Sequence, residues 1–344
     1  MTWKMKAAAA ALAILGSVGT AAAEGALNIY NWGDYTSPEM IKKFEQKYDV
    51  KVTVTDYDSN DTALAKIRAG GHGFDIVVPS ANYIPIWIKE GLLLESRPDQ
   101  MENFKNVDER WVNVPWDPGR HYSVPWQWGF SGIGINKKMY SGDINTAAIF
   151  LDPPKELVGK INVEPEMNDV LFAAIKYLGG EWCTDDKVLL KKVRDKLIEA
   201  KPKWLAMDYS VTEKLPSGDY AAVYYWNGAI MRARLKNPDV AFGYPKEGYP
   251  IFMDSATILK DAKNVENAKK FLNFIMEPEN AALISAFAKY ANGIKGSAAF
   301  LPPEMKDAPE LVIPAQYEKA GEFLKACSPE VSQLYARIWT DVNK

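Results

Sequence analysis

The stretch LNIYNWGDYTSPEMIKKFEQKYDVKVTV, residues 27–54, contains the pattern that decides the fold. Its first four residues, 27–30, have the apolar composition of a buried strand. Ser37 followed by Pro38 is typical of a helix start, because serine caps free N–H groups and proline fits the first turn. Alternating valines at residues 50–54 predict a second strand. We therefore predict a strand–helix–strand unit.

The residues that follow continue this order. Asn60 or Asp61 can cap a short helix, which glycines at 70, 71 and 73 end before the apolar run 74–78. Strands joined by helices usually lie parallel in one sheet, so we predict an α/β fold with mostly parallel sheets and helices on both faces. Further strands are expected at residues 132–135, 221–226 and 240–244, and further helices at 169–178, 188–200, 228–235, 265–276, 279–288 and 329–342.

The chain length predicts two lobes. Its 344 residues exceed what one hydrophobic core usually supports. No low-complexity linker separates tandem domains, which favours two lobes joined by several short crossings. We place the first lobe at residues 24–130 plus 254–297, and the second at residues 131–253 plus 298–344.

The N-terminal residues 1–23 have the layout of a secretory signal peptide. Lys4 and Lys6 precede an apolar run over residues 7–18, and the alanines ending at Ala23 suit a cleavage site. The run is short for a membrane span, although a membrane anchor is the alternative interpretation. We expect cleavage near Ala23 and a periplasmic protein.

Composition argues against several classes of function. The formal net charge is −3 and no basic stripe is present, which argues against nucleic-acid binding. With two histidines and no CxxC, GxGxxG or P-loop sequence, we predict no metal site and no cofactor. Cys183 and Cys327 could form one disulfide in an oxidising compartment, or remain as two buried thiols.

Aromatic and acidic residues occur together in four segments. These are residues 31–35, 78–83, 225–228 and 252–255. Three of them follow predicted strands, and ligands of open α/β sheets bind beyond the carboxyl ends of strands. A buried ammonium needs carboxylates for charge balance and aromatic faces for cation–π contact. Each residue alone could be a core aromatic or a helix cap, but the combination predicts a site for a small cation.

The same segments resemble those of the bacterial spermidine/putrescine-binding proteins. The similarity runs from Leu27 to the C-terminus. Its motifs are Tyr30-Asn-Trp-Gly-Asp-Tyr35, Tyr57-Asp-Ser-Asn60, Phe74-Asp-Ile-Val-Val-Pro-Ser80, Tyr225-Trp-Asn-Gly228, Tyr244-Pro-Lys-Glu-Gly248 and Met253-Asp-Ser255. The resemblance implies a two-lobed periplasmic-binding-protein fold of type II. It also implies a binding protein that captures a polyamine, putrescine or spermidine, and delivers it to the membrane permease of an ABC importer. We expect a monomer.

Twelve residues are candidates to line the cleft, most of them by this resemblance. They are Trp32, Asp34, Tyr35, Ser80, Tyr83, Glu166, Asp169, Asp208, Trp226, Phe252, Asp254 and Tyr290. Phe252 and Tyr290 match putrescine-type members, whereas Ala229 stands where those members carry an aspartate. Asp208 is a candidate to replace that acid. Asn82 stands where spermidine-type members carry an aromatic residue.

Other ligands and an enzyme remain as alternatives. Lys325 falls roughly where spermidine-type members have a glutamine, and in the cleft it would favour an ω-amino acid such as γ-aminobutyrate, or an opine. Asp34 and Asp254 would also suit a glycosidase or a sugar-binding protein. The sequence Gly129-Phe-Ser-Gly-Ile133 departs from the serine-hydrolase pattern G-x-S-x-G at its last position. We therefore predict binding without catalysis.

Overall fold

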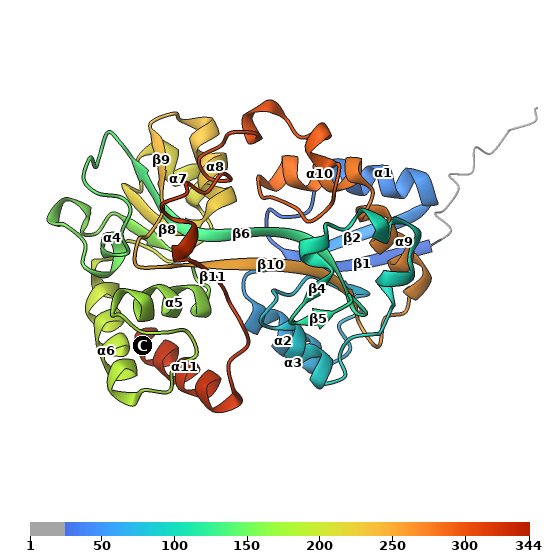
Figure 1. The fold of residues 1–344 in the computed structure, drawn as a ribbon, viewed down its shortest axis with the longest axis horizontal. Coiled ribbons are helices and arrows are strands. Elements are labelled where there is room, and N and C mark those ends of the chain that lie inside the picture. Colours follow the sequence, from blue (N-terminus) through green and yellow to red (C-terminus); the bar gives the residue numbers. More distant parts are fainter. Residues whose placement is uncertain (1–24) are drawn as a thin grey trace, which may run out of the picture.

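One mixed sheet runs through the whole molecule (Figure 1). The computed structural model describes residues 25–344, so the signal-peptide prediction lies outside the described residues. Within residues 25–344 the sheet has nine strands, in the order β2-β1-β3-β10-β6-β8-β7, with β11 beside β10 and β9 beside β6. The predicted α/β class, with two lobes, is confirmed.

Two long antiparallel strands connect the lobes. β6 (Ser123–Asn136) and β10 (Tyr249–Ile258) pair along much of their length and extend across the molecule from one lobe to the other (Figure 1). The sequence predicted only residues 132–135 of β6. In the structure its first half pairs with β10 and its second half with β8 and β9. These strands therefore place residues of both lobes beside one cleft.

The first lobe is built on parallel strands. β1 (Gly25–Trp32) pairs in parallel with β2 (Val50–Tyr57) and β3 (Ile76–Val77). The Oγ atom of Ser37 accepts a hydrogen bond from the N–H of Met40, which confirms the predicted start of the first helix. The lobe's helices are α1 (Pro38–Tyr48), α2 (Asn60–Arg68), α3 (Ile84–Lys89), α9 (Val265–Ile275) and α10 (Pro278–Ala288).

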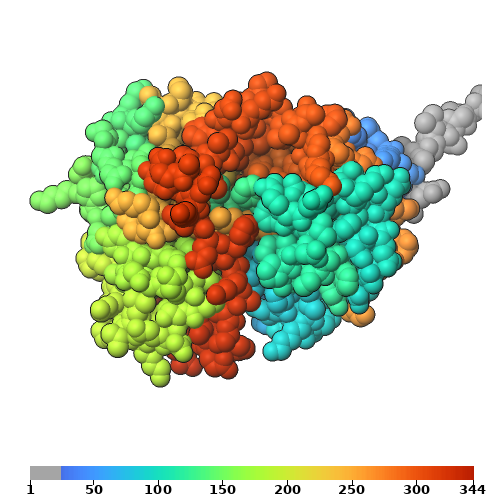
Figure 2. All heavy atoms as spheres, viewed as in Figure 1, coloured from blue at the N-terminus to red at the C-terminus, as the bar shows by residue number. Residues whose placement is uncertain are grey.

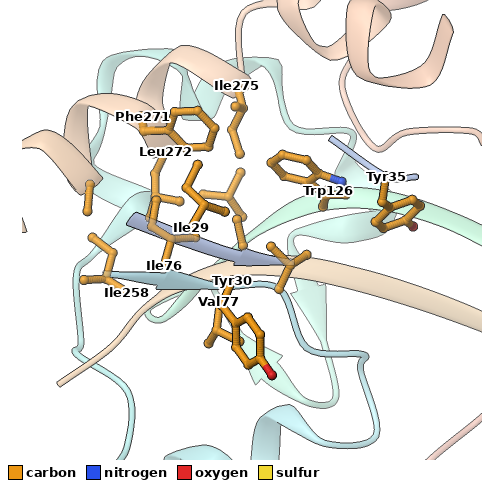
Figure 3. Close-up of a cluster of buried hydrophobic side chains, with 14 of the residues drawn as sticks. Ile29, Tyr30, Tyr35, Ile76, Val77, Trp126, Ile258, Phe271, Leu272 and Ile275 are labelled. Atoms are coloured by element: carbon orange, nitrogen blue, oxygen red, sulfur yellow. The ribbon is translucent and has the colours of Figure 1, made fainter. Parts of the chain in front are cut away.

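Strand alternation gives the first lobe its core. Ile29 faces the side on which Phe271 and Leu272 of α9 pack, while the neighbouring Tyr30 points to the opposite side (Figure 3). Buried side chains of this core come from residues 27–126 and 253–294. A short hairpin, β4 (Asn113–Val114) with β5 (Asp117–Pro118), and the 3-10 helices Pro98–Gln100, Glu102–Asn106 and Glu109–Trp111 complete this lobe.

The second lobe has the same plan. β7 (Ile161–Val163) pairs in parallel with β8 (Ala222–Trp226), and β9 (Val240–Gly243) and β11 (Gly321–Phe323) lie on β6 and β10. Its α-helices are α4 (Ala148–Leu151), α5 (Met167–Tyr177), α6 (Lys187–Ala200), α7 (Val211–Ser217), α8 (Asn227–Lys236) and α11 (Pro329–Val342). Short 3-10 helices lie at Lys155–Leu157, Lys201–Lys203, Ser297–Phe300, Pro303–Met305 and Glu318–Ala320.

The predicted lobe boundaries remain a proposal, and the cores change close to them but not at the same residues. Trp126 and Met253 belong to the first core, whereas Phe130 and Tyr249 belong to the second lobe's apolar clusters. The change of core therefore falls within β6 and β10. No helix of residues 25–344 has both the length and the apolar character needed to cross a membrane.

A disulfide anchors the C-terminal segment to the second lobe. The sulfur atoms of Cys183 and Cys327 are bonded, at 2.04 Å, and the indole N–H of Trp182 donates to the carbonyl oxygen of Lys325 at 3.0 Å. This segment, coloured red, lies along the depression between the lobes (Figure 2). The bond therefore fixes residues that border the cleft.

Candidate functional site

A cavity lies between the two lobes beside β6 and β10. It contains about 700 Å³ of empty space, part of which is open to solvent. Both lobes contribute side chains, and the aromatic and acidic residues of the predicted segments dominate its walls. The lining residues are Trp32, Gly33, Asp34, Tyr35, Asn60, Ser80, Asn82, Glu166, Asp169, Tyr209, Thr212, Tyr225, Trp226, Ala229, Arg232, Phe252, Asp254, Tyr290 and Leu324.

Asp254 is the buried acid on the first-lobe side of the cavity. Its side chain accepts hydrogen bonds from the hydroxyl of Ser80 at 2.6 Å and from that of Tyr35 at 2.8 Å. The residue is only 4% exposed, and no cationic side chain of residues 25–344 lies within 4.0 Å of its carboxylate. Burial raises the pKa of Asp254 to about 7, although both hydrogen bonds oppose the rise. An ammonium group at this position would therefore serve as the counter-ion of a buried acid.

Asp169 supplies a second acid from the opposite lobe. It lies in the first turn of α5, and its Oδ2 atom accepts from the hydroxyl of Ser131 at 2.9 Å and the indole N–H of Trp226 at 3.1 Å. Burial raises the pKa of Asp169 to about 6. Glu164 lies beside it, fully buried, with its Oε2 atom 3.1 Å from the hydroxyl oxygen of Ser131. Burial, followed by the charge of Asp169, raises the pKa of Glu164 well above its usual value.

Glu166 connects the lobes at the edge of this acidic group. Its carboxylate accepts from the backbone N–H of Asn60, the first residue of α2, at 3.4 Å. Burial raises the pKa of Glu166 well above its usual value, and the charges of Asp169 and Asp61 raise it further. The cavity wall therefore gathers three buried carboxyl groups, those of Asp254, Asp169 and Glu166.

Aromatic rings form the remaining walls. The rings of Trp32 and Trp226 meet edge to face across the lobes, with centroids 6.1 Å apart. The indole N–H of Trp32 donates to the carbonyl of Val78, which fixes the ring. Tyr290 packs edge to face on both Tyr35, at 5.4 Å, and Phe252, at 5.8 Å. Such faces suit a cation with a methylene chain, because the ring faces attract ammonium groups and the rings pack on methylenes.

The structure brings ten of the twelve predicted residues to this cavity and places two elsewhere. The phenol of Tyr83 donates to Asp61 at 2.9 Å and accepts from Asn168 at 3.3 Å, in a separate groove between the lobes. Asp208 accepts from Tyr220 and pairs with Lys214 at 3.3 Å, outside the cavity. Because a neighbouring cation already balances its charge, Asp208 does not replace the acid missing at position 229.

Lys325 also lies outside the cavity. It borders the same separate groove as Tyr83 and Cys327. The residue before it, Leu324, is the one that lines the cavity. The predicted carboxylate-binding role of Lys325 therefore has no support from its position.

Sequence reasoning missed several lining residues. Tyr225 and Asn60 belong to the motifs shared with the resembling family but were not predicted to bind the ligand. Tyr209, Thr212 and Arg232 lie in segments without a recognisable sequence pattern. Tyr209 and Arg232 connect the two lobes. The hydroxyl of Tyr209 donates to the backbone oxygen of Asp58 at 2.5 Å, and Arg232 Nη1 donates to that of Ala288 at 2.6 Å. The lobes are thus closed over the cavity.

Comparisons with known proteins identify the family. Residues 39–313 match the family described as bacterial extracellular solute-binding protein. The spermidine/putrescine-binding periplasmic protein of Escherichia coli K12 is 30% identical over 336 residues, covering 96% of each chain. The putrescine-binding periplasmic protein PotF of the same organism is 30% identical over 349 residues, covering 95% of this chain and 94% of its own.

Solved structures agree with this match. The spermidine/putrescine ABC transporter substrate-binding protein PotD of Streptococcus pneumoniae superposes with a TM-score of 0.75 at 25% identity, covering 93% of this chain and 98% of its own. The TpPotD lipoprotein of Treponema pallidum superposes with a TM-score of 0.80 at 27% identity, covering 92% and 99%. The chain therefore belongs to the bacterial extracellular solute-binding proteins and, among them, to the spermidine/putrescine-binding protein family.

Proposed function

We propose that this protein captures a polyamine, putrescine or spermidine, between its two lobes in the periplasm and delivers it to the permease of an ABC importer. The observation that carries the proposal is the buried carboxylate of Asp254. Ser80 and Tyr35 hold it in place, and among residues 25–344 no cationic side chain lies within 4.0 Å of it. A buried carboxylate without a counter-ion is costly, and a bound ammonium removes that cost.

The charge of the cavity favours more than one ammonium. Asp254 and Asp169 face it from opposite lobes, and Glu166 adds a third carboxyl group. Burial raises the pKa of Asp254 and of Asp169, so a nearby ammonium would stabilise the ionised form of each. A diamine supplies two positive charges joined by methylenes, which the rings of Trp226 and Phe252 can cover. This pattern supports a polyamine over a neutral sugar.

Lobe closure supports capture rather than catalysis. Contacts such as that of Tyr209 with Asp58 hold the lobes together over the site, and a ligand that touches both lobes stabilises this closed form. In the proposed cycle, the closed and loaded protein docks on the permease as a monomer. The relatives named for spermidine and putrescine support this transport role.

A calorimetric panel tests the proposal. Putrescine, spermidine, γ-aminobutyrate and maltose are titrated into the mature protein, with thermal unfolding recorded in parallel. Saturating polyamine, at about 100-fold above its dissociation constant, should add about 2.7 kcal/mol to the free energy of unfolding. Failure of both putrescine and spermidine to bind, while γ-aminobutyrate or maltose binds, would contradict the proposed ligand class.

A further inference from the structure

Arg232 brings a positive charge to an otherwise acidic cavity. It lies in α8 (Asn227–Lys236), three positions after Ala229, and residues at this spacing share one face of a helix. Both side chains line the cavity. Because Ala229 offers only a methyl group, Arg232 is the charged residue that α8 contributes to this cavity.

The guanidinium group is fixed but its charge is not balanced by an acid. Its Nη1 donates to the carbonyl oxygen of Ala288, the last residue of α10, at 2.6 Å. No carboxylate of residues 25–344 lies within 4.0 Å of it. Arg234, on the same helix, shows the contrasting case: it forms two hydrogen bonds with the carboxylate of Glu310, at 2.6 and 2.8 Å.

The positive charge of Arg232 affects the pKa of tyrosines that line the cavity. Burial raises the pKa of Tyr290 and that of Tyr225, and the positive charge of Arg232 opposes both rises. Tyr290 also feels the negative charge of Asp254. The cavity is therefore electrostatically uneven, with carboxylates at Asp254 and Asp169 and a cation where α8 meets α10.

We propose that Arg232 determines ligand specificity. It disfavours an ammonium group at the α8 end of a bound ligand and favours a hydrogen-bond acceptor there, such as a carboxylate or an amide oxygen. Arginine suits this role because its guanidinium stays charged and donates several hydrogen bonds. The inference rests on the proposed function, in which the carboxylate of Asp254 receives an ammonium. Relative to a diamine, an ω-amino acid of similar length gains affinity from Arg232.

The test compares two ligands that differ at one end. Putrescine and γ-aminobutyrate share an ammonium on a short methylene chain, but the second has a carboxylate at the other end. Dissociation constants for both are measured by calorimetry with wild type and with Arg232→Met, which removes the charge. The ratio of the putrescine constant to the γ-aminobutyrate constant should fall at least tenfold in the variant. A ratio within twofold of wild type would overturn the proposal.

Controls separate charge from folding and closure. Arg232→Lys keeps the charge and should keep the wild-type ratio. Arg232→Gln removes the charge but can still donate to Ala288, so it should shift the ratio as Arg232→Met does, and it replaces that variant should the latter not fold. Lys236→Met removes an exposed cation from the same helix, and an equal shift in that variant would overturn the proposal.

The outcomes also distinguish the inference from the proposed function. If amines bind wild type but the ratio does not change in the Arg232 variants, only the inference is wrong. If putrescine and spermidine both fail to bind wild type, the proposed function is wrong, and if γ-aminobutyrate also fails to bind, the inference is wrong as well.

Discussion

Replacing Asp254 with asparagine should remove most of the affinity for a polyamine while leaving the protein folded. Asparagine has nearly the same shape and can still interact with the hydroxyl groups of Ser80 and Tyr35, which lie 2.6 and 2.8 Å from the carboxylate. What it lacks is the negative charge. A ligand ammonium at this position would then be desolvated without a counter-ion.

The size of the loss follows from the burial of Asp254. Two unit charges about 4 Å apart attract by about 4 kcal/mol at an effective dielectric constant of about 20. Removing one partner of such a buried pair typically costs about 2–5 kcal/mol. This corresponds to a loss of affinity from about 30-fold to several thousand-fold.

The stability of the empty protein should change in the opposite direction. The pKa of Asp254 rises on folding, from an ordinary value of 3.8 to about 7. The folded protein therefore binds this proton more tightly than the unfolded chain, and Asp254 lowers the free energy of unfolding as pH rises through this window. Asparagine has no such charge. At pH 8 the empty variant should unfold at or above the wild-type temperature.

Calorimetry with putrescine and thermal unfolding check both parts. Asp208→Asn is the matched control, because it removes one carboxylate from the chain at a position outside the cavity. Its affinity should equal that of wild type. Near-normal putrescine affinity in a well-folded Asp254→Asn protein, or an equal loss in Asp208→Asn, would refute the assignment.

Three further outcomes are expected. Putrescine affinity should fall as pH drops below about 7, because the pKa of Asp254 is raised to about 7 and that of Asp169 to about 6, and only the ionised acids attract an ammonium; calorimetry between pH 8 and pH 5 with a flat profile would contradict this. Replacing Cys183 and Cys327 with serine should lower the free energy of unfolding by about 2–5 kcal/mol in urea titrations, because the bond closes a loop of 144 positions; an unchanged transition midpoint would argue against the bond. Trp226→Leu should weaken putrescine binding about tenfold, since it removes both an aromatic face and the N–H donor to Asp169; calorimetry giving the wild-type constant would remove Trp226 from the site.

Local signals account for the parts of the fold that the sequence predicted. Ser37 and Pro38 mark a helix start through bonds within one turn, and the valines of residues 50–54 mark a strand by simple alternation. The first half of β6 carried no such signal, because Pro125 and Gly129 interrupt the pattern. Pairing with the distant strand β10 stabilises it nevertheless. Such pairing is a long-range contact that a local pattern does not contain.

The sequence by itself determined the strand–helix order, the family resemblance and the aromatic and acidic character of the site, because these depend on neighbouring residues. Only the tertiary structure decided which charges face the ligand. Tyr35 and Asp254 are hydrogen-bonded although they lie 219 residues apart in the sequence, whereas Asp208 pairs with Lys214 outside the cavity. Arg232 reaches the cavity because α8 packs toward the end of α10. Burial and charge pairing depend on these distant contacts, so the electrostatics of the cavity appear only when the chain is folded.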